Sequence, residues 1–162
     1  ITINTVSAGG TPGMWDVHEV QGITELRAGT YIYNDRHIVG SGTAILDECA
    51  THVHATVTSR PTGNRAVIDA GSKTLSSDLM RPEYGQGYGL ILEYPKAIIK
   101  KLNEEHGIID LCACTTKPKI GEVVRIVPNH VCVVTNLHDE VAVHRKGLVE
   151  GIWPVAARGK TK

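Results

Sequence analysis

Short segments of alternating or β-branched residues, separated by turn formers, are the feature that most constrains this chain. His52–Ser59 alternates Val and Thr with small or polar residues, and Arg60-Pro61-Thr62-Gly63-Asn64 follows it as a turn. Helical periodicity is weak: Ser76–Met80 predicts one short turn, and Tyr94–Asn103 is ambiguous because Pro95 can begin a helix or flank an edge strand. Further strands are expected at Ile1–Val6, Glu25–Tyr33, Arg65–Ala70, Gly89–Tyr94, Ile108–Cys112, Val123–Val127 and Glu140–His144. Short strands at short spacing predict a mostly β fold, an antiparallel barrel or sandwich.

The composition is that of a globular protein with an aliphatic core. Of the 162 residues, 41% are hydrophobic and 21% charged, and Phe is absent. Lys and Arg together number 17, as do Asp and Glu, so the formal net charge is zero. That balance argues against a nucleic-acid coat or a polybasic membrane anchor. The sequence also contains no apolar run of membrane-spanning length. We therefore expect a cytoplasmic protein with no nucleic-acid or membrane partner, in which the four cysteines are reduced thiols.

The strongest local signal for chemistry is Pro128-Asn129-His130-Val131-Cys132. In an extended segment, residues two apart lie on one face with Cα atoms about 6.6 Å apart, so both side chains can reach one metal ion. Two ligands are too few for a closed structural zinc site and leave positions open to water and substrate. The alternative is a core Cys beside a hydrogen-bonded His.

Other segments compete for functional roles. Cys112-Ala113-Cys114 and His52-Val53-His54 repeat the same spacing, but neither has a matching second pair at zinc-ribbon spacing. The Gly-rich loops Ser7–Thr11 and Arg27–Thr30 offer backbone N–H groups to an anion, although a plain turn explains the first equally well. Lys73 suggests a Schiff-base lysine, but the surrounding turn formers favour a surface loop.

Six segments together resemble one known family. In order along Val6 to Lys160 they are VSAGGTP, ELRAGTYIYND, AVIDAGSKTLSSD, LNEEHG, VRIVPNHVCVVTNLHDE and WPVAARGK, and PNHVC and WPVAARG are the most specific. They resemble the D-threonine aldolase and D-serine dehydratase family, which is pyridoxal-phosphate dependent and has the alanine-racemase-like fold. The resemblance implies an N-terminal (β/α)8 barrel that holds the cofactor, a C-terminal β domain, and a homodimer.

The resemblance also implies a division of this chain. Residues 1–36 correspond to the last barrel strands and phosphate-binding loops, and residues 37–162 to the β domain with the metal site. Because the sequence begins inside an apolar run without an initiator Met, we expect it to be the C-terminal part of a longer enzyme. Without barrel neighbours, Ile1–Val6 and Glu25–Tyr33 are expected to be disordered or paired with another chain, while the remainder keeps its own β core.

Site roles follow from the same resemblance. It places the cofactor phosphate on Gly9, Gly10, Thr11, Gly29 and Thr30, with Arg27 towards the cofactor ring. It implies that His130 and Cys132 bind a divalent metal, zinc or alternatively manganese or magnesium. The Schiff-base lysine of the family lies near the first barrel strand and is not in this chain, so Lys73 is not given that role. The chain alone is expected to be inactive.

The activity implied for the whole enzyme is lyase chemistry on a D-3-hydroxy amino acid. The reaction is either β-elimination, as in a dehydratase, or retro-aldol cleavage, as in an aldolase. A thiolate ligand beside a histidine favours the dehydratase branch. The alternative from a different class is a non-catalytic β-rich binding or interaction module with a structural Cys/His pair.

Overall fold

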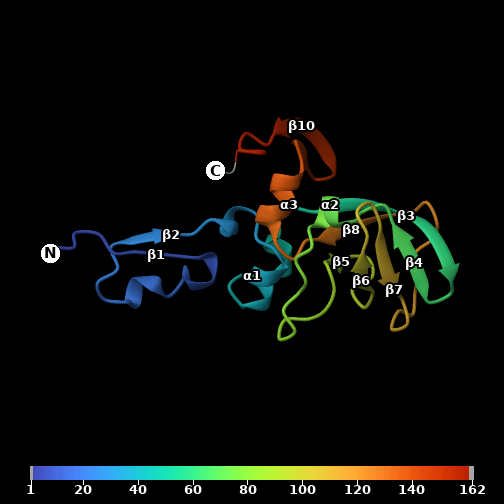
Figure 1. Ribbon diagram of the computed structural model, residues 1–162, viewed down its shortest axis with the longest axis horizontal. Coiled ribbons are helices and arrows are strands. Elements are labelled where there is room, and N and C mark those ends of the chain that lie inside the picture. The colour runs from blue at the N-terminus through green and yellow to red at the C-terminus, as the bar shows by residue number, and fades with distance from the viewer. Residues whose placement is uncertain (1, 161–162) are drawn as a thin grey trace.

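A nearly closed antiparallel β-barrel forms the largest part of the structure (Figure 1). This computed structural model describes residues 2–160. Six strands run in the order β5-β8-β3-β4-β7-β6, and every neighbouring pair is antiparallel. Their bounds are Val53–Thr62 (β3), Arg65–Ile68 (β4), Leu90–Ile91 (β5), Ile98–Leu102 (β6), Gly107–Asp110 (β7) and Val123–Val127 (β8). The Tyr88 N–H donates to the Ile99 carbonyl at 3.0 Å and brings the two end strands together. The prediction of an antiparallel β-barrel is confirmed.

The alternation in β3 sets the core. Val53, Ala55 and Val57 point inwards and are buried, and the register places Ala55 opposite Val124 of β8. Ile and Val side chains from the other strands fill the interior, while Tyr88 and Tyr94 pack at its border. The core is therefore aliphatic, as the composition predicts.

Several expected elements differ from the structure. Ile1 lies outside the described residues, and the first strand, β1, is Ser7–Gly9 rather than the preceding alternating run. Only Glu25–Arg27 of the second expected strand is β (β2), because Ala28 and Gly29 lead into a 3-10 turn at Thr30–Ile32. Ser76–Met80 is not helical: helix α2 is Ser72–Leu75, and Ser76 ends it with φ +63°. The ambiguous Tyr94–Asn103 contains a strand, β6.

The N-terminal residues form an arm beside the barrel, at the left of Figure 1. Strands β1 and β2 pair in parallel, with Ser7 opposite Glu25 and Gly9 opposite Arg27. Two 3-10 turns, Thr11–Gly13 and Val17–Glu19, lie in the connection between them. Glu25–Arg27 therefore pairs with a strand of the same chain. The expectation that Ile1–Val6 and Glu25–Tyr33 are disordered or paired with another chain stays a prediction.

Three short helices lie between this arm and the barrel: α1 (Arg36–Gly40), α2 and α3 (Val131–Leu137) (Figure 1). A 3-10 turn at Leu46–Glu48 follows α1. After α3 the chain forms a separate antiparallel hairpin, β9 (Glu140–Arg145) and β10 (Leu148–Pro154). Within residues 2–160, no helix has both the length and the apolar character needed to span a membrane. The candidate site lies in this central region, where the arm, the helices and the end of β8 meet.

Candidate functional site

His130 and Cys132 lie at the start of helix α3. His130 has extended backbone angles (φ −137°, ψ 100°) and immediately precedes the helix, whereas Cys132 is inside its first turn. The segment is not extended throughout, because the helix begins between the two residues. Both side chains nevertheless reach the surface: that of His130 is 43% exposed, and Cys132 is exposed.

A buried carboxylate fixes where α3 begins. Asp35, only 1% exposed, accepts the N–H of Ile38 through Oδ1 and the N–H of Val131 through Oδ2, each at 3.0 Å. One side chain therefore caps α1 and also satisfies an otherwise unpaired donor at the start of α3. No local pattern predicts the second bond, because it joins residues 96 positions apart.

Two further residues, Arg36 and Asn129, connect α1 and the start of α3 to the rest of the structure through hydrogen bonds. The Arg36 guanidinium donates to the Gln86 carbonyl at 2.6 Å and to Asn129 Oδ1 at 3.3 Å. Asn129, fully buried, donates through Nδ2 to the carbonyls of Asp78 and Gly87, each at 2.8 Å. Burial lowers the pKa of Arg36. These bonds hold the residue immediately before His130 in one position.

Three other side chains lie close to the His130–Cys132 pair. Asp78 Oδ2 lies 3.5 Å from His130 Nδ1, and the His37 ring meets the His130 ring edge-on with centroids 6.4 Å apart. Thr30 Oγ1 lies 3.5 Å from Cys132 Sγ. Burial lowers the pKa of His37, and the positive charges of Arg81 and His130 add to that effect while Asp35 opposes it. A neutral His37 places no extra positive charge beside a bound cation.

The donors present fit a divalent metal. Imidazole and thiolate are ligands that zinc prefers. Two side-chain atoms of this region, His37 Nε2 and Asp78 Oδ2, are buried without a hydrogen-bond partner, and such orphaned polar atoms are costly unless a further group completes the site. Among the described residues, no cluster of three or more His, Cys, Asp or Glu side chains is arranged to hold a metal. The sequence-predicted pair His130 and Cys132 would supply two of the ligands and leave coordination positions open; the pair stays a prediction.

The two Gly-rich loops expected to bind phosphate lie next to each other. Gly9–Thr11 follows β1 and Gly29–Thr30 follows β2, and the Tyr31 N–H donates to Thr11 Oγ1 at 3.1 Å. Within residues 2–160, the N–H groups of Gly29 and Thr30 have no protein acceptor. A Cβ on Gly29 would meet nothing within 4 Å, so space remains beside this loop. Exposed donors in open space fit an anion.

Packing explains part of the glycine pattern in the first loop. A Cβ on Gly9 would lie 3.2 Å from the Arg27 carbonyl, so the close approach of β1 and β2 favours glycine there. Gly10 has φ +130°, and its N–H donates to the same carbonyl at 3.3 Å. A hollow of about 350 Å³ lies beside these glycines and Leu26. The Arg27 side chain is mostly exposed, and its Nε donates to Ser7 Oγ at 2.8 Å.

Thr30 joins the two candidate sites. It belongs to the second Gly-rich loop, and its hydroxyl oxygen lies 3.5 Å from the Cys132 sulfur. The residues that the sequence proposes for cofactor and for metal, about a hundred positions apart, are therefore parts of one region.

Two further residues with reactive side chains are Lys73, considered from the sequence as a Schiff-base lysine, and Cys49. Lys73 lies on the exposed face of α2, where it pairs with Glu104 at 3.0 Å and Glu105 at 2.7 Å, and the hydrogen bond to Glu105 raises its pKa. Cys49 is buried, and burial raises the pKa of its thiol to about 11. Neither residue has the environment of an activated nucleophile.

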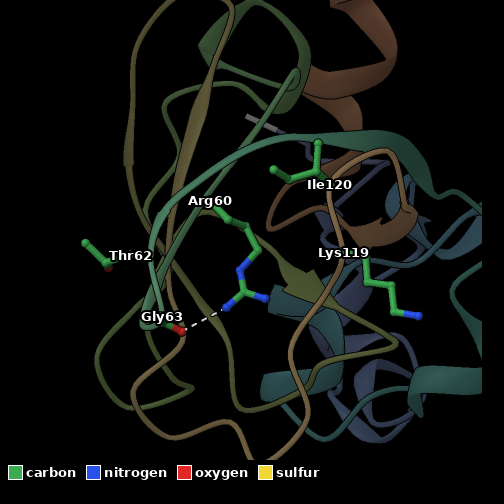
Figure 2. Close-up of a pocket in the computed structure, with 5 residues that line it drawn as sticks. All are labelled: Arg60, Thr62, Gly63, Lys119 and Ile120. Atoms are coloured by element: carbon green, nitrogen blue, oxygen red, sulfur yellow. Dashed lines mark hydrogen bonds between the residues drawn. The ribbon is translucent and has the colours of Figure 1, made fainter.

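A larger hollow of about 430 Å³ lies at the β3–β4 turn (Figure 2). Its central cation, Arg60, donates to the Gly63 and Pro118 carbonyls, each at 3.0 Å, and Lys119 points away from it (Figure 2). These side chains do not converge on a common point, so the hollow is not a candidate for the chemistry.

Comparisons with known proteins identify the family of this chain. Residues 50–144 match the family described as "Putative serine dehydratase domain". The chain is 34% identical over 162 residues to D-threonine aldolase from Arthrobacter sp., covering 98% of this chain and 41% of that protein. It is 32% identical over 141 residues to D-threo-3-hydroxyaspartate dehydratase from Delftia sp. (strain HT23), covering 78% of this chain and 37% of that protein. The chain thus spans less than half the length of these relatives.

Solved structures give the same result. The Delftia dehydratase superposes with a TM-score of 0.80 at 27% identity, over 95% of this chain and 44% of that one. An alanine-racemase-like protein from Idiomarina loihiensis also gives 0.80, at 26% identity and the same coverage. Two further structures of a D-threo-3-hydroxyaspartate dehydratase carry alanine in place of a histidine or of a cysteine two positions later, and the cysteine variant is in the metal-free form. By sequence and by fold, this chain belongs to the D-threonine aldolase and D-serine dehydratase family, and its barrel is the alanine-racemase-like C-terminal domain.

Proposed function

We propose that this chain is the C-terminal part of a pyridoxal-phosphate- and metal-dependent lyase that acts on D-3-hydroxy amino acids. The observation that carries the proposal is the 3.5 Å contact between Thr30 of the phosphate loop and Cys132 of the metal pair. It makes the two sets of residues neighbours, as one active site requires. The family relatives, which are aldolases and dehydratases of D-amino acids, support the same reaction class.

In this proposal the residues of this chain bind and orient the cofactor. The N–H groups of Gly29 and Thr30, with the Thr11 hydroxyl beside them, hold the cofactor phosphate. Pyridoxal phosphate, when bound, supplies the electron sink for cleavage next to the α-carbon. Arg27 faces the cofactor ring, and the remaining groups, including the Schiff-base lysine, come from a preceding (β/α)8 barrel. A homodimeric, cytoplasmic enzyme is part of the proposal.

His130 and Cys132 hold a divalent cation at the edge of the cofactor region. A thiolate and an imidazole favour zinc over manganese or magnesium, which prefer oxygen ligands. The cation supplies polarisation of the substrate β-hydroxyl. Because Cys132 occupies the second ligand position, we favour dehydration over aldol cleavage. The metal-free cysteine variant of the related dehydratase supports this assignment of ligands.

The metal assignment is tested by elemental analysis of the protein at its full natural length. We expect about one zinc per chain and loss of that zinc in His130→Ala and in Cys132→Ala. Thiol labelling gives an independent readout: the exposed Cys132 should react quickly without metal and be protected by zinc, whereas the buried Cys49 should react slowly in both cases. If both alanine variants keep metal and activity, the ligands are wrong, and the non-catalytic module with a structural Cys/His pair becomes the better account.

The phosphate loops are tested by a substitution that the chain itself tolerates. A Cβ at Gly29 meets no neighbour within 4 Å, so Gly29→Val should leave the fold intact but crowd a bound phosphate. We expect at least tenfold weaker pyridoxal-phosphate binding, measured by absorbance titration. Gly63→Val is the matched control, because Gly63 is equally open and lies on the β3–β4 turn. Equal cofactor affinity in both variants would contradict the role of this loop.

A further inference from the structure

Asp78 lies beside His130 because a buried amide holds it there. Its carbonyl accepts a hydrogen bond from Asn129 Nδ2 at 2.8 Å, and Asn129 directly precedes His130. Its N–H donates to Ser76 Oγ at 3.1 Å, in a turn where Ser76 has φ +63°. The backbones on both sides of the Asp78–His130 contact are therefore fixed, although the two residues are far apart in the sequence.

The Asp78 side chain presents one oxygen to His130. The carboxylate is 40% exposed overall, but its Oδ2 is buried and has no hydrogen-bond partner. His130 Nδ1 lies 3.5 Å from that oxygen. A carboxylate oxygen hidden from water is costly unless it receives a donor, and a protonated Nδ1 is the donor within reach.

We propose that Asp78 is the positioning residue for His130, holding the imidazole in the tautomer that carries its proton on Nδ1 and leaves Nε2 for the metal. The inference rests on the proposed metal site. Metal-binding histidines commonly donate their second ring nitrogen to a carboxylate, which fixes the ring and strengthens the ligand. The present separation exceeds that of a usual N–H···O hydrogen bond, about 2.7–3.2 Å, so we expect the contact to shorten when Nε2 is engaged.

His37 is the competing partner for this carboxylate. Its ring lies edge-on to His130, and its Nε2 is also buried without a partner. The backbone N–H of His37 donates to the Asn129 carbonyl at 3.3 Å, which fixes its position in helix α1 but leaves the ring free. The short ion-pair distance belongs to His130 alone among the described residues.

The experiment compares zinc affinity by chelator competition in the full-length protein. Asp78→Ala removes the carboxylate but keeps the backbone hydrogen bonds, and we expect zinc to bind about 10- to 100-fold more weakly. Asp78→Asn retains an acceptor oxygen and should recover part of that loss. Asp47→Asn removes a negative charge from an exposed residue and serves as the control, with wild-type affinity expected.

A second readout uses no metal and no activity. Nitrogen chemical shifts of the His130 ring in the zinc-free protein should report the Nδ1–H tautomer in the wild type and a mixture of tautomers in Asp78→Ala. Wild-type affinity in Asp78→Ala, together with zinc loss in His130→Ala, would overturn the role of Asp78 and leave the metal site standing. An affinity loss with an unchanged His130 tautomer would also overturn it. If His130→Ala itself keeps zinc, the proposed metal site fails instead.

Discussion

Asp35 shows how one buried residue determines the geometry of the candidate metal site. Its two oxygens receive N–H groups from α1 and α3, and the second bond determines that the helix starts at Val131. Cys132 therefore lies in a helical turn and contacts Thr30 rather than following His130 along a strand. A carboxyl group that is 1% exposed needs such donors, because water does not reach its oxygens.

We expect Asp35→Ala to lower the free energy of unfolding by about 2–4 kcal/mol, because two charge-assisted hydrogen bonds are lost and two buried donors remain. Urea denaturation measures the change, with the surface variant Asp47→Asn as the control. The helix start should also loosen, so the Cys132 thiol should change its labelling rate. A loss below about 1 kcal/mol would show that water or a neighbour replaces the carboxylate.

At the scale of elements, the start of β3 gathers positive charge around His52. His54 lies opposite Arg125 of β8 in the sheet register. Burial is the main reason that the pKa of His52 is lowered, and Arg125, His54 and His144 of β9 add to it, while Glu93 opposes. The folded protein thus favours the neutral imidazole at this junction of three strands.

The lowered pKa of His52 makes the stability of the folded protein depend on pH. Because the folded pKa lies below the unfolded value of about 6.5, the unfolded chain binds more protons as the pH falls. The contribution of His52 is fully present above about pH 6.5 and is lost as the pH falls through the folded pKa. His52→Gln should flatten the decline in thermal stability between neutral pH and about pH 5, and the exposed His106→Gln should not. An unchanged decline in the first variant would contradict the assignment.

At the scale of the whole molecule, residues just before the predicted division at residue 37 are bonded to the barrel side. The Arg36 guanidinium donates to the carbonyls of Gln86 and Gly89, and the Arg36 N–H donates to the Pro128 carbonyl at 3.0 Å. The preceding Asp35 binds α3. The division into residues 1–36 and 37–162 stays a prediction, and these contacts suggest that an independently folding unit begins a few residues earlier.

Two truncated chains test where that unit begins. We expect residues 33–162 to unfold cooperatively in urea, because the Asp35 and Arg36 contacts are retained. Residues 37–162 should be less stable by at least about 2 kcal/mol, since several buried hydrogen bonds to charged groups are missing. Equal midpoints and slopes for both chains would place the boundary at residue 37 after all.

The sequence by itself determined what depends on neighbouring residues. The period of two in His52–Ser59 predicted a strand there, and the scarcity of aromatic residues predicted an aliphatic core. The segment from Pro128 to Cys132 marked the candidate metal pair, and its resemblance to known enzymes identified the family.

Only the tertiary structure decided how those residues meet. Three contacts join segments about 50 to 100 residues apart. Asp35 binds the start of α3, Thr30 contacts Cys132, and Asp78 approaches His130. The secondary-structure propensity of a short segment cannot predict such contacts, because they form only when the barrel has closed and buried Asn129 and Asp35. A buried polar group takes its partners from whatever the fold places beside it, and for this reason the site's geometry could not be read from the spacing of its residues.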